Sequence, residues 1–293
     1  MKNFKLLLIA LLGFGLSLNA QTKKATNTLL WEISGNGLKK PSYLFGTYHL
    51  ISAKFADTMK VLQEKLESAD AVVSEIVMDS STQSKIAPFL IMKDNTLDHL
   101  LTKAEFKEVE DYFKTKQPGF ELEQMNKFKP AMVSIMMVLF ESPDMLNGIS
   151  EGIDDSFQKY ARKNGKSLYG LETAEYQGAL LFDSDLQKQK KALLKSIREA
   201  DKSKQKMEEL KTDYIAQDID KLTDFFKIQD EETKEFMTEL LKNRNKRWLD
   251  QLPALMQSQS LFIAVGAGHL VGAEGLIKGL QLKGYILQPV ATN

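Results

Sequence analysis

The alternation of apolar and polar positions predicts strands at both ends of the chain and helices between them. Residues 29–34 and 42–46 are short apolar-rich segments on either side of a turn region that is rich in glycine, which is the pattern of a β-hairpin. Residues 57–69 carry apolar side chains at helical spacing, and residues 71–78 form an apolar run that predicts a buried strand. The chain therefore begins with a hairpin, a helix and a third strand.

The middle of the chain is mainly helical in pattern. Residues 80–163 include a methionine-rich run at 131–140, which is too short to cross a bilayer and is typical of a core helix that could also line a groove. Residues 167–172 return to a strand pattern. Residues 188–248 then form a long, charged helical stretch that contains neither proline nor glycine.

The end of the chain repeats the order of strand, helix and strand at residues 261–265, 273–282 and 285–290. These elements predict an α/β (α+β) fold, in which a mixed central β-sheet is formed from both chain ends. Large helical insertions are expected at about 80–163 and 188–250. No clear linker divides the chain, so residues 21–293 are predicted to form a single domain.

The first twenty residues have the pattern of a secretory signal peptide. Lys2 and Lys5 precede an apolar stretch at 6–18, and small or polar residues follow up to Ala20, after which we expect cleavage. The apolar stretch is short for a membrane span, so no stable membrane anchor is expected after cleavage. We therefore predict a periplasmic or secreted protein.

Charge and cysteine content exclude several classes of function. The 293 residues contain 39 basic and 39 acidic side chains, and removal of the two lysines before Ala20 leaves 37 against 39, a formal charge of −2. A nucleic-acid-binding protein normally has a basic surplus or stripe, so no nucleic-acid partner is expected. Because the chain has no cysteine, disulfides, thiolate metal sites and a cysteine nucleophile are excluded.

Two of the three histidines lie in the same local pattern. His49 and His269 each end a Gly-x-x-His unit that follows a short apolar run, at residues 46–49 and 266–269. Imidazole is the usual proton carrier near neutral pH and a common metal ligand, so two copies at matched strand ends suggest one shared chemical site. The alternative is that both histidines simply end hairpins or cap helices. His99 has no such glycine and is predicted to be a surface or half-buried helix residue.

Two glutamates follow the same rule of position at strand ends. Glu75 lies late in the third predicted strand, among apolar neighbours, where an ionised carboxylate is costly unless a metal, a cation or several donors compensate it. Glu172 ends the fourth predicted strand, and it could equally be a first-turn acid of the next helix. Two imidazoles and up to two carboxylates suit manganese, cobalt, iron or zinc, and a water on such a metal is acidified enough for hydrolysis.

These residues lie in blocks that resemble the TraB/PrgY/GumN family, which is related to the Tiki proteins, over nearly all of the chain after the signal peptide. The similar blocks are residues 43–50, 69–75, 152–154, 170–173, 243–248 and 264–270. The resemblance implies an erythromycin-esterase/ChaN-like fold and, from the Tiki branch, a metal-dependent peptidase that uses Mn²⁺ or Co²⁺. The PrgY-like branch is instead associated with blocking peptide pheromones, and the GumN-like branch with polysaccharide gene clusters.

The resemblance also implies roles for individual residues. It makes His49, Glu75 and His269 the metal and catalytic centre, with Glu172 as a fourth member. Arg244 and Asn245 would lie near that centre, where they could stabilise an oxyanion or hold a substrate carboxylate; the alternative for both is a solvated helix face. Tyr48 could also donate a hydrogen bond, although an aromatic residue there more often packs.

The first hypothesis is therefore an exported metal-dependent hydrolase that cleaves peptide or protein substrates. Mn²⁺ or Co²⁺ is the expected metal, with Zn²⁺ or Fe²⁺ as alternatives, and the oligomeric state is open. A second hypothesis keeps the hydrolase but lets a histidine and Glu75 activate water without metal. A third is a non-catalytic protein that sequesters a peptide or another ligand under the methionine-rich helix.

Overall fold

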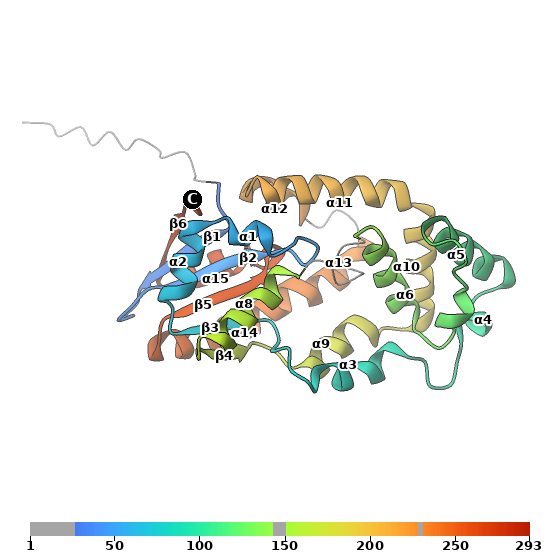
Figure 1. Ribbon diagram of the computed structural model, residues 1–293, viewed down its shortest axis with the longest axis horizontal. Coiled ribbons are helices and arrows are strands. Elements are labelled where there is room, and N and C mark those ends of the chain that lie inside the picture. The colour runs from blue at the N-terminus through green and yellow to red at the C-terminus, as the bar shows by residue number, and fades with distance from the viewer. Residues whose placement is uncertain (1–26, 143–150, 228–230) are drawn as a thin grey trace, which may run out of the picture.

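A six-stranded mixed sheet forms the centre of one half of the molecule (Figure 1), and it is built from both ends of the chain. The computed structural model describes residues 27–142, 151–227 and 231–293. The strand order is β4-β3-β5-β2-β1-β6, in which β4, β3, β5 and β2 run parallel to one another and β1 is antiparallel to both its neighbours. The strands are β1 (Leu30–Gly35), β2 (Ser42–Thr47), β3 (Ala71–Ser74), β4 (Ser167–Gly170), β5 (Leu261–Gly266) and β6 (Tyr285–Val290).

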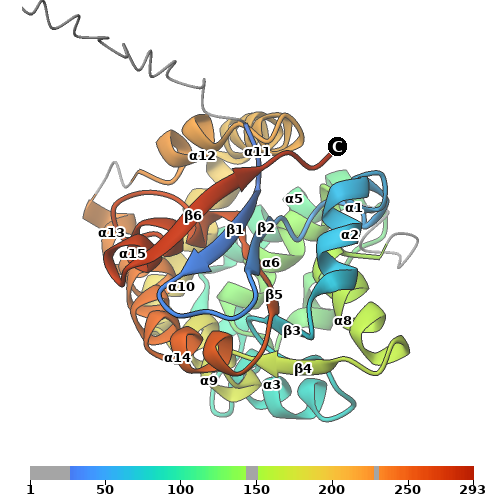
Figure 2. The same cartoon turned by 90° about the vertical axis from the view of Figure 1, so that its left-hand side faces the viewer.

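Helices cover both faces of this sheet, because alternate side chains of its central strands are apolar on both sides. Val72 of β3 points into a core that contains α2 (Lys60–Ser68) and α8 (Ile153–Lys163). Its neighbour Val73 points into a second core that contains α14 (Arg244–Ser258) and α15 (Leu276–Leu282). Figure 2 shows α2 and α8 on one side of the sheet and α14 and α15 on the other.

The helices between residues 97 and 140 and the helix at 186–198 extend away from the sheet and form a lobe with its own apolar core (Figure 1). The methionine-rich run is a helix as predicted, and it buries Val133 and Met137 in this core. A capping box between Thr102 and Glu105 fixes the start of α5. The helices not yet named are α1 (Lys54–Asp57), α3 (Thr82–Leu90), α4 (Leu97–Leu100), α5 (Lys103–Lys116), η1 (Leu122–Met125), α6 (Pro130–Phe140), α9 (Ala174–Phe182), α10 (Leu186–Arg198), α11 (Ala200–Ile215), α12 (Ile219–Phe225), α13 (Glu231–Met237), η2 (Thr238–Asn243) and η3 (Ala267–His269).

The predicted fold class is confirmed, and the differences lie in element boundaries. The third strand ends at Ser74, four residues before the predicted end at 78, because the backbone beyond it bonds to the loop after β4 and to α8. The stretch 188–248 is divided into several helices rather than one continuous element. One break is at Gln217, whose φ of 54° ends α11, and Asp218 then caps α12.

Three smaller differences concern helices. The helix predicted at 57–69 is α2, which spans Lys60–Ser68 and is preceded by the short helix α1 at Lys54–Asp57, and the helix expected at 273–282 begins only at Leu276. His99 is an exposed residue of α4, as predicted. The predicted signal peptide at 1–20 lies outside the described residues. Within the described residues, the structure contains no helix of the length and apolarity that a membrane span requires.

Candidate active site

The two Gly-x-x-His units lie side by side at one edge of the sheet. Strands β2 and β5 are parallel neighbours, and Gly46 pairs with Val265 in their register. A Cβ at Gly46 would lie 3.1 Å from the Cα of Ala267, so the close contact between the two units favours glycine at this position. His49 and His269 therefore leave the carboxyl ends of adjacent strands, which is where ligands usually bind in α/β sheets.

Glu75 follows β3 directly and turns its carboxylate toward β5 and α14. Its Oε1 accepts a hydrogen bond from the backbone N–H of Gly266 at 2.9 Å. Its Oε2 accepts from Arg244 Nη2 at 2.5 Å and from Gln177 Nε2 at 3.2 Å. A Cβ at Gly266 would lie 3.3 Å from the same carboxylate, so the absence of a side chain there allows the carboxylate to approach.

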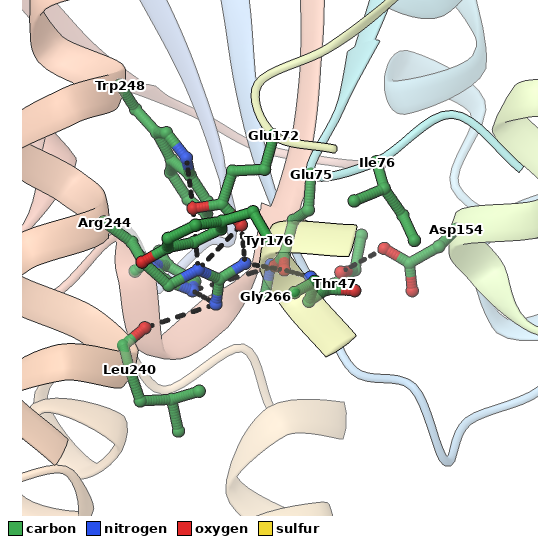
Figure 3. Close-up of polar contacts among 12 residues, drawn as sticks. Thr47, Glu75, Ile76, Asp154, Glu172, Tyr176, Leu240, Arg244, Trp248 and Gly266 are labelled. Carbon is green, nitrogen blue, oxygen red and sulfur yellow. Dashed lines mark hydrogen bonds and ion pairs between the residues drawn. The ribbon is translucent and has the colours of Figure 1, made fainter. Parts of the chain in front are cut away.

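Arg244 is the most highly connected residue of the site, and its side chain is 3% exposed. Nε donates to both oxygens of Glu172 at 3.0 Å, and Nη2 lies 2.9 Å from the same carboxylate. Nη1 donates to the carbonyl of Leu240 at 3.2 Å and lies 3.0 Å from His269 Nε2. Together with the bond to Glu75, these contacts engage every nitrogen of the guanidinium (Figure 3).

Local structure explains why the arginine lies there. Arg244 begins α14 directly after the π-helical turn η2, and such turns are frequent at functional sites. Its guanidinium also lies 4.7 Å from the ring centre of Trp248, one turn further along the same helix.

Glu172 is a buried partner of this arginine rather than a helix-capping acid. Its side chain is 3% exposed, and it also accepts a hydrogen bond from Trp248 Nε1 at 3.1 Å. The N-cap of α9 is instead Thr173, whose side chain accepts from the backbone N–H of Tyr176. Glu172 therefore belongs to the cluster of polar side chains around Arg244 and does not cap α9.

His269 is buried, and its tautomer follows from its partners. Both amide hydrogens of Asn245 are used, since Nδ2 donates to the carbonyls of His269 and Glu274 at 3.1 and 2.8 Å. Asn245 Oδ1 is therefore an acceptor, and it receives the Nδ1–H of His269 at 2.7 Å. The lone pair of His269 is left on Nε2, which faces Arg244 Nη1 and lies 3.8 Å from Glu75 Oε1.

His49 is held in a comparable way but is exposed. Its Nδ1 lies 2.8 Å from Oδ2 of Asp154, and its side chain is 66% exposed. The hydroxyl of Thr47 donates to Oδ1 of the same carboxylate at 2.7 Å, an interaction drawn in Figure 3. In both histidines an oxygen partner therefore fixes Nδ1. Nε2 of His49 has no partner among the described residues, whereas Nε2 of His269 faces Arg244 Nη1.

The charges of the site follow from burial and neighbours. Burial raises the pKa of Glu75, but the positive charges of His269, Arg244 and His49 and the Gly266 N–H outweigh it and lower the pKa to about 2. Burial lowers the pKa of His269 to about 3, against the attraction of Glu75. Because His269 is thus neutral at pH 7, Arg244 is the buried cation that compensates Glu75 there.

His49 and Arg244 are shifted in the opposite direction. The carboxylate of Asp154 raises the pKa of His49 to about 9. Burial would lower the pKa of Arg244, but Glu75 and Glu172 more than compensate and raise it. At neutral pH the centre therefore combines an ionised carboxylate, a neutral imidazole and a protonated imidazole.

Imidazole nitrogens and a carboxylate are suitable ligands for a divalent metal, but in this structure Arg244 lies between two of them. Nε2 of His49, Nε2 of His269 and the Glu75 carboxylate are the atoms that could hold one, each with a second hydrogen-bond partner that orients it. Within residues 27–142, 151–227 and 231–293, no three histidine, aspartate or glutamate side chains are already gathered around one point. Arg244 bonds to both Glu75 and His269, so a metal between them would have to displace it.

The structure brings together most of the residues proposed from the sequence and adds several others. Glu75, Glu172, His269, Arg244 and Asn245 form one connected cluster. Tyr48 packs against Tyr214, with ring centres 5.5 Å apart, and its interpretation as a packing residue is the one that the contacts favour. The additional members are Asp154, Thr47, Gln177, Trp248 and the N–H of Gly266.

Little in the sequence distinguished the added residues. Asp154 lies in the first turn of α8, where an acid is expected simply because it complements the helix dipole. The resemblance includes the segment 152–154 but assigns no role to Asp154. The pairing with His49 depends on the packing of α8 beside β2, which no local pattern encodes.

The fold and site together define an α/β protein with a buried Glu–Arg–His cluster at the carboxyl ends of parallel strands. The TraB/PrgY/gumN family model matches residues 29–289, so the chain belongs to the TraB/PrgY/gumN family. Comparisons with curated proteins and with solved structures found no match. The family is thus confirmed, while the erythromycin-esterase/ChaN-like fold remains a prediction.

Proposed function

We propose that this protein is a hydrolase that cleaves peptide bonds at the edge of the sheet that carries Glu75, His269 and His49. The observation that carries the proposal is the pairing of an ionised, buried carboxylate with a neutral imidazole whose Nδ1 is fixed by Asn245. Perturbed titratable groups that are held in place at strand ends are typical of catalytic centres. The two groups face one another, with Glu75 Oε1 3.8 Å from His269 Nε2.

In this mechanism Glu75 accepts the proton of a water that attacks the substrate carbonyl. His269 Nε2 accepts a hydrogen bond from Arg244 Nη1 and so helps to hold the arginine that keeps Glu75 ionised. Protonated His49 lies at the exposed side of the centre, where it can donate a proton to the departing amine. Asn245 and Asp154 are positioning residues, because each holds Nδ1 of one histidine. Arg244 also positions, since its nitrogens are committed to protein partners and it holds Glu75 ionised.

We include a divalent metal in the proposal, with Mn²⁺ or Co²⁺ preferred and Zn²⁺ or Fe²⁺ as alternatives. His49, His269 and Glu75 would hold it, with Glu172 as a further carboxylate, and it would supply a more acidic water and polarise the carbonyl. His49 must lose its second proton to bind a metal, so the affinity should increase with pH. A metal-independent hydrolase is the second candidate, favoured by the position of Arg244 between Glu75 and His269.

Elemental analysis and hydrolysis assays test these two forms of the proposal. The purified chain and the His49→Ala/His269→Ala double variant are analysed for bound metal, and both are incubated with a mixture of synthetic peptides with and without chelator. The metal form predicts metal in the parent chain only, and cleavage that chelator stops. Cleavage that persists in metal-free buffer supports the second candidate. Intact peptides under every condition contradict both.

Export is a separate part of the proposal. The pattern at residues 1–20 and the cleavage expected after Ala20 would place the mature chain in the periplasm or outside the cell. Mass spectrometry of the chain recovered from the extracellular or periplasmic fraction should show an N-terminus at residue 21. A chain retained in the cytoplasm with residues 1–20 intact contradicts export and leaves the chemistry of the site unaffected.

A further inference from the structure

Arg247, a cation beside the cluster, has guanidinium N–H groups that have no partner among the described residues. Arg247 lies on α14 three residues after Arg244, which places the two side chains about one helical turn apart on the same side of the helix. Unlike Arg244, whose side chain is 3% exposed, the side chain of Arg247 is 42% exposed. The two neighbouring arginines thus differ in access to solvent and therefore to a ligand.

The carboxylate nearest to Arg247 is already occupied by other donors. Arg247 Nη2 lies 3.5 Å from Glu172 Oε1, which is an ion-pair contact at a longer distance than the contacts of Arg244 with the same group. Glu172 also accepts from Trp248 Nε1. One carboxylate therefore lies between two guanidiniums, and Arg247 is the less well compensated of the two.

Tyr176 completes the arrangement. Arg247 Nη2 donates to its hydroxyl oxygen, and the guanidinium carbon lies 4.5 Å from the centre of its ring. Since the hydroxyl oxygen accepts this bond, its own proton is available to donate, and no acceptor for it is found among the described residues. The pair thus presents guanidinium N–H groups and one O–H donor, with the guanidinium held in place by the ring.

This donor pair is adjacent to the reaction centre. Gln177, the residue after Tyr176, donates to Glu75, and Arg247 shares Glu172 with Arg244. A group bound by Arg247 and Tyr176 would therefore belong to the same ligand that reaches Glu75.

We propose that Arg247 and Tyr176 form a recognition position for a carboxylate of the substrate. Nε and Nη1 of Arg247 have no partner among the described residues, so their N–H groups can donate to a carboxylate, and the guanidinium remains charged at any physiological pH. The inference rests on the proposed function and deepens it, because it names the substrate class as peptides that present a carboxylate next to the cleaved bond. That carboxylate is either the C-terminus of the peptide or an acidic side chain.

Equilibrium binding of small probes tests the inference without requiring turnover. N-acetyl-alanine is compared with its amide, and N-acetyl-glutamate α-amide with the matching glutamine compound, by NMR titration of the whole chain. Hydrogen bonds to a charged group lead us to expect roughly tenfold tighter binding of the acid in at least one pair. The pair that shows the preference identifies a terminal or a side-chain carboxylate.

Variants then assign the preference to the proposed residues. Arg247→Gln should reduce the preference to about one, and Tyr176→Phe should reduce it severalfold while keeping the ring. The matched control is Arg198→Gln, which removes an exposed arginine paired with Glu108 in the helical lobe and should leave the preference unchanged. Thermal unfolding of each variant verifies that the fold is intact.

The inference is overturned if neither acid binds more tightly than its neutral counterpart, or if Arg247→Gln keeps the preference. These outcomes are independent of the hydrolase proposal. If the chain binds the acids more tightly but cleaves no peptide, the recognition position is supported and the proposed function is contradicted. If the chain cleaves peptides but binds each acid probe no more tightly than its neutral counterpart, only the recognition position is contradicted.

Discussion

Replacing Arg244 with methionine should be among the most destabilising single changes in this protein. The substitution keeps a long apolar side chain but leaves Glu75 and Glu172 buried without their cation. Breaking a buried ion pair by removing one partner costs about 3–5 kcal/mol, because the remaining charge is not compensated. At about 2–4 °C per kcal/mol for a domain of this order of size, the midpoint of thermal unfolding should fall by roughly 6–20 °C.

The pH dependence of the Arg244→Met variant distinguishes this cause from lost packing. Without the arginine, burial raises the pKa of Glu75, so the carboxylate can take up a proton at mildly acidic pH. The penalty should therefore shrink as the pH falls from 7 toward 5. A packing defect would be independent of pH over this interval.

Chemical unfolding in urea, followed by circular dichroism, measures the effect at each pH. Arg198→Gln is the control, since its pair with Glu108 is on the surface and should be worth about 1 kcal/mol or less. Adding Glu75→Gln and Glu172→Gln to the Arg244→Met variant should recover part of the loss, because no buried charge remains. If the loss of unfolding free energy is no larger than in the control, or does not change with pH, the unpaired carboxylates are not what destabilises the variant.

Three further predictions follow from the same contacts. The free energy of unfolding should decrease as pH falls from about 6.5 to about 3, because His269 takes up a proton in the unfolded chain but not in the folded one. It should decrease further between about 4.5 and about 2, because Glu75 is likewise protonated first in the unfolded chain. A free energy of unfolding that does not change with pH in urea titrations would contradict both pKa shifts. Asp154→Asn should lower the pKa of His49 from about 9 toward 6.5 in an NMR titration, and an unchanged value would exclude Asp154 as the cause. Gly266→Ala should cost about 1–3 kcal/mol and reduce hydrolysis, because its Cβ would lie 3.3 Å from the Glu75 carboxylate; unchanged stability and activity would show that the carboxylate can move freely.

The sheet was predictable from sequence because its strands are short apolar runs with distinct boundaries. Residues 261–265 and 285–290 are each bounded by polar or turn residues, and the structure has strands there. The helical region was predictable in type but not in its divisions. Gln217 adopts a left-handed backbone conformation without being glycine, so the break between α11 and α12 left no clear signal.

The site was predictable where residue type and strand position agreed. A histidine after a glycine, or a glutamate among apolar residues, is unusual enough to be noticed in a single sequence, as for His49, Glu75 and His269. The roles of Asp154 and Arg247 could not be predicted, because both residues have ordinary helical surroundings and meet the site only through tertiary packing. Most charged residues of such helices are exposed to solvent, so a residue that contacts the site cannot be recognised among them from the sequence.

The most direct test of the account is mass spectrometry of a peptide mixture incubated with the purified chain and with a Glu75→Gln variant that is shown to be folded. The parent chain should produce new fragments and the variant should leave the peptides intact, because the substitution removes the carboxylate that accepts the proton of water. Fragments formed equally by both chains would contradict the assignment of Glu75. Intact peptides with the parent chain, supplied with Mn²⁺ or Co²⁺, would contradict the hydrolase itself.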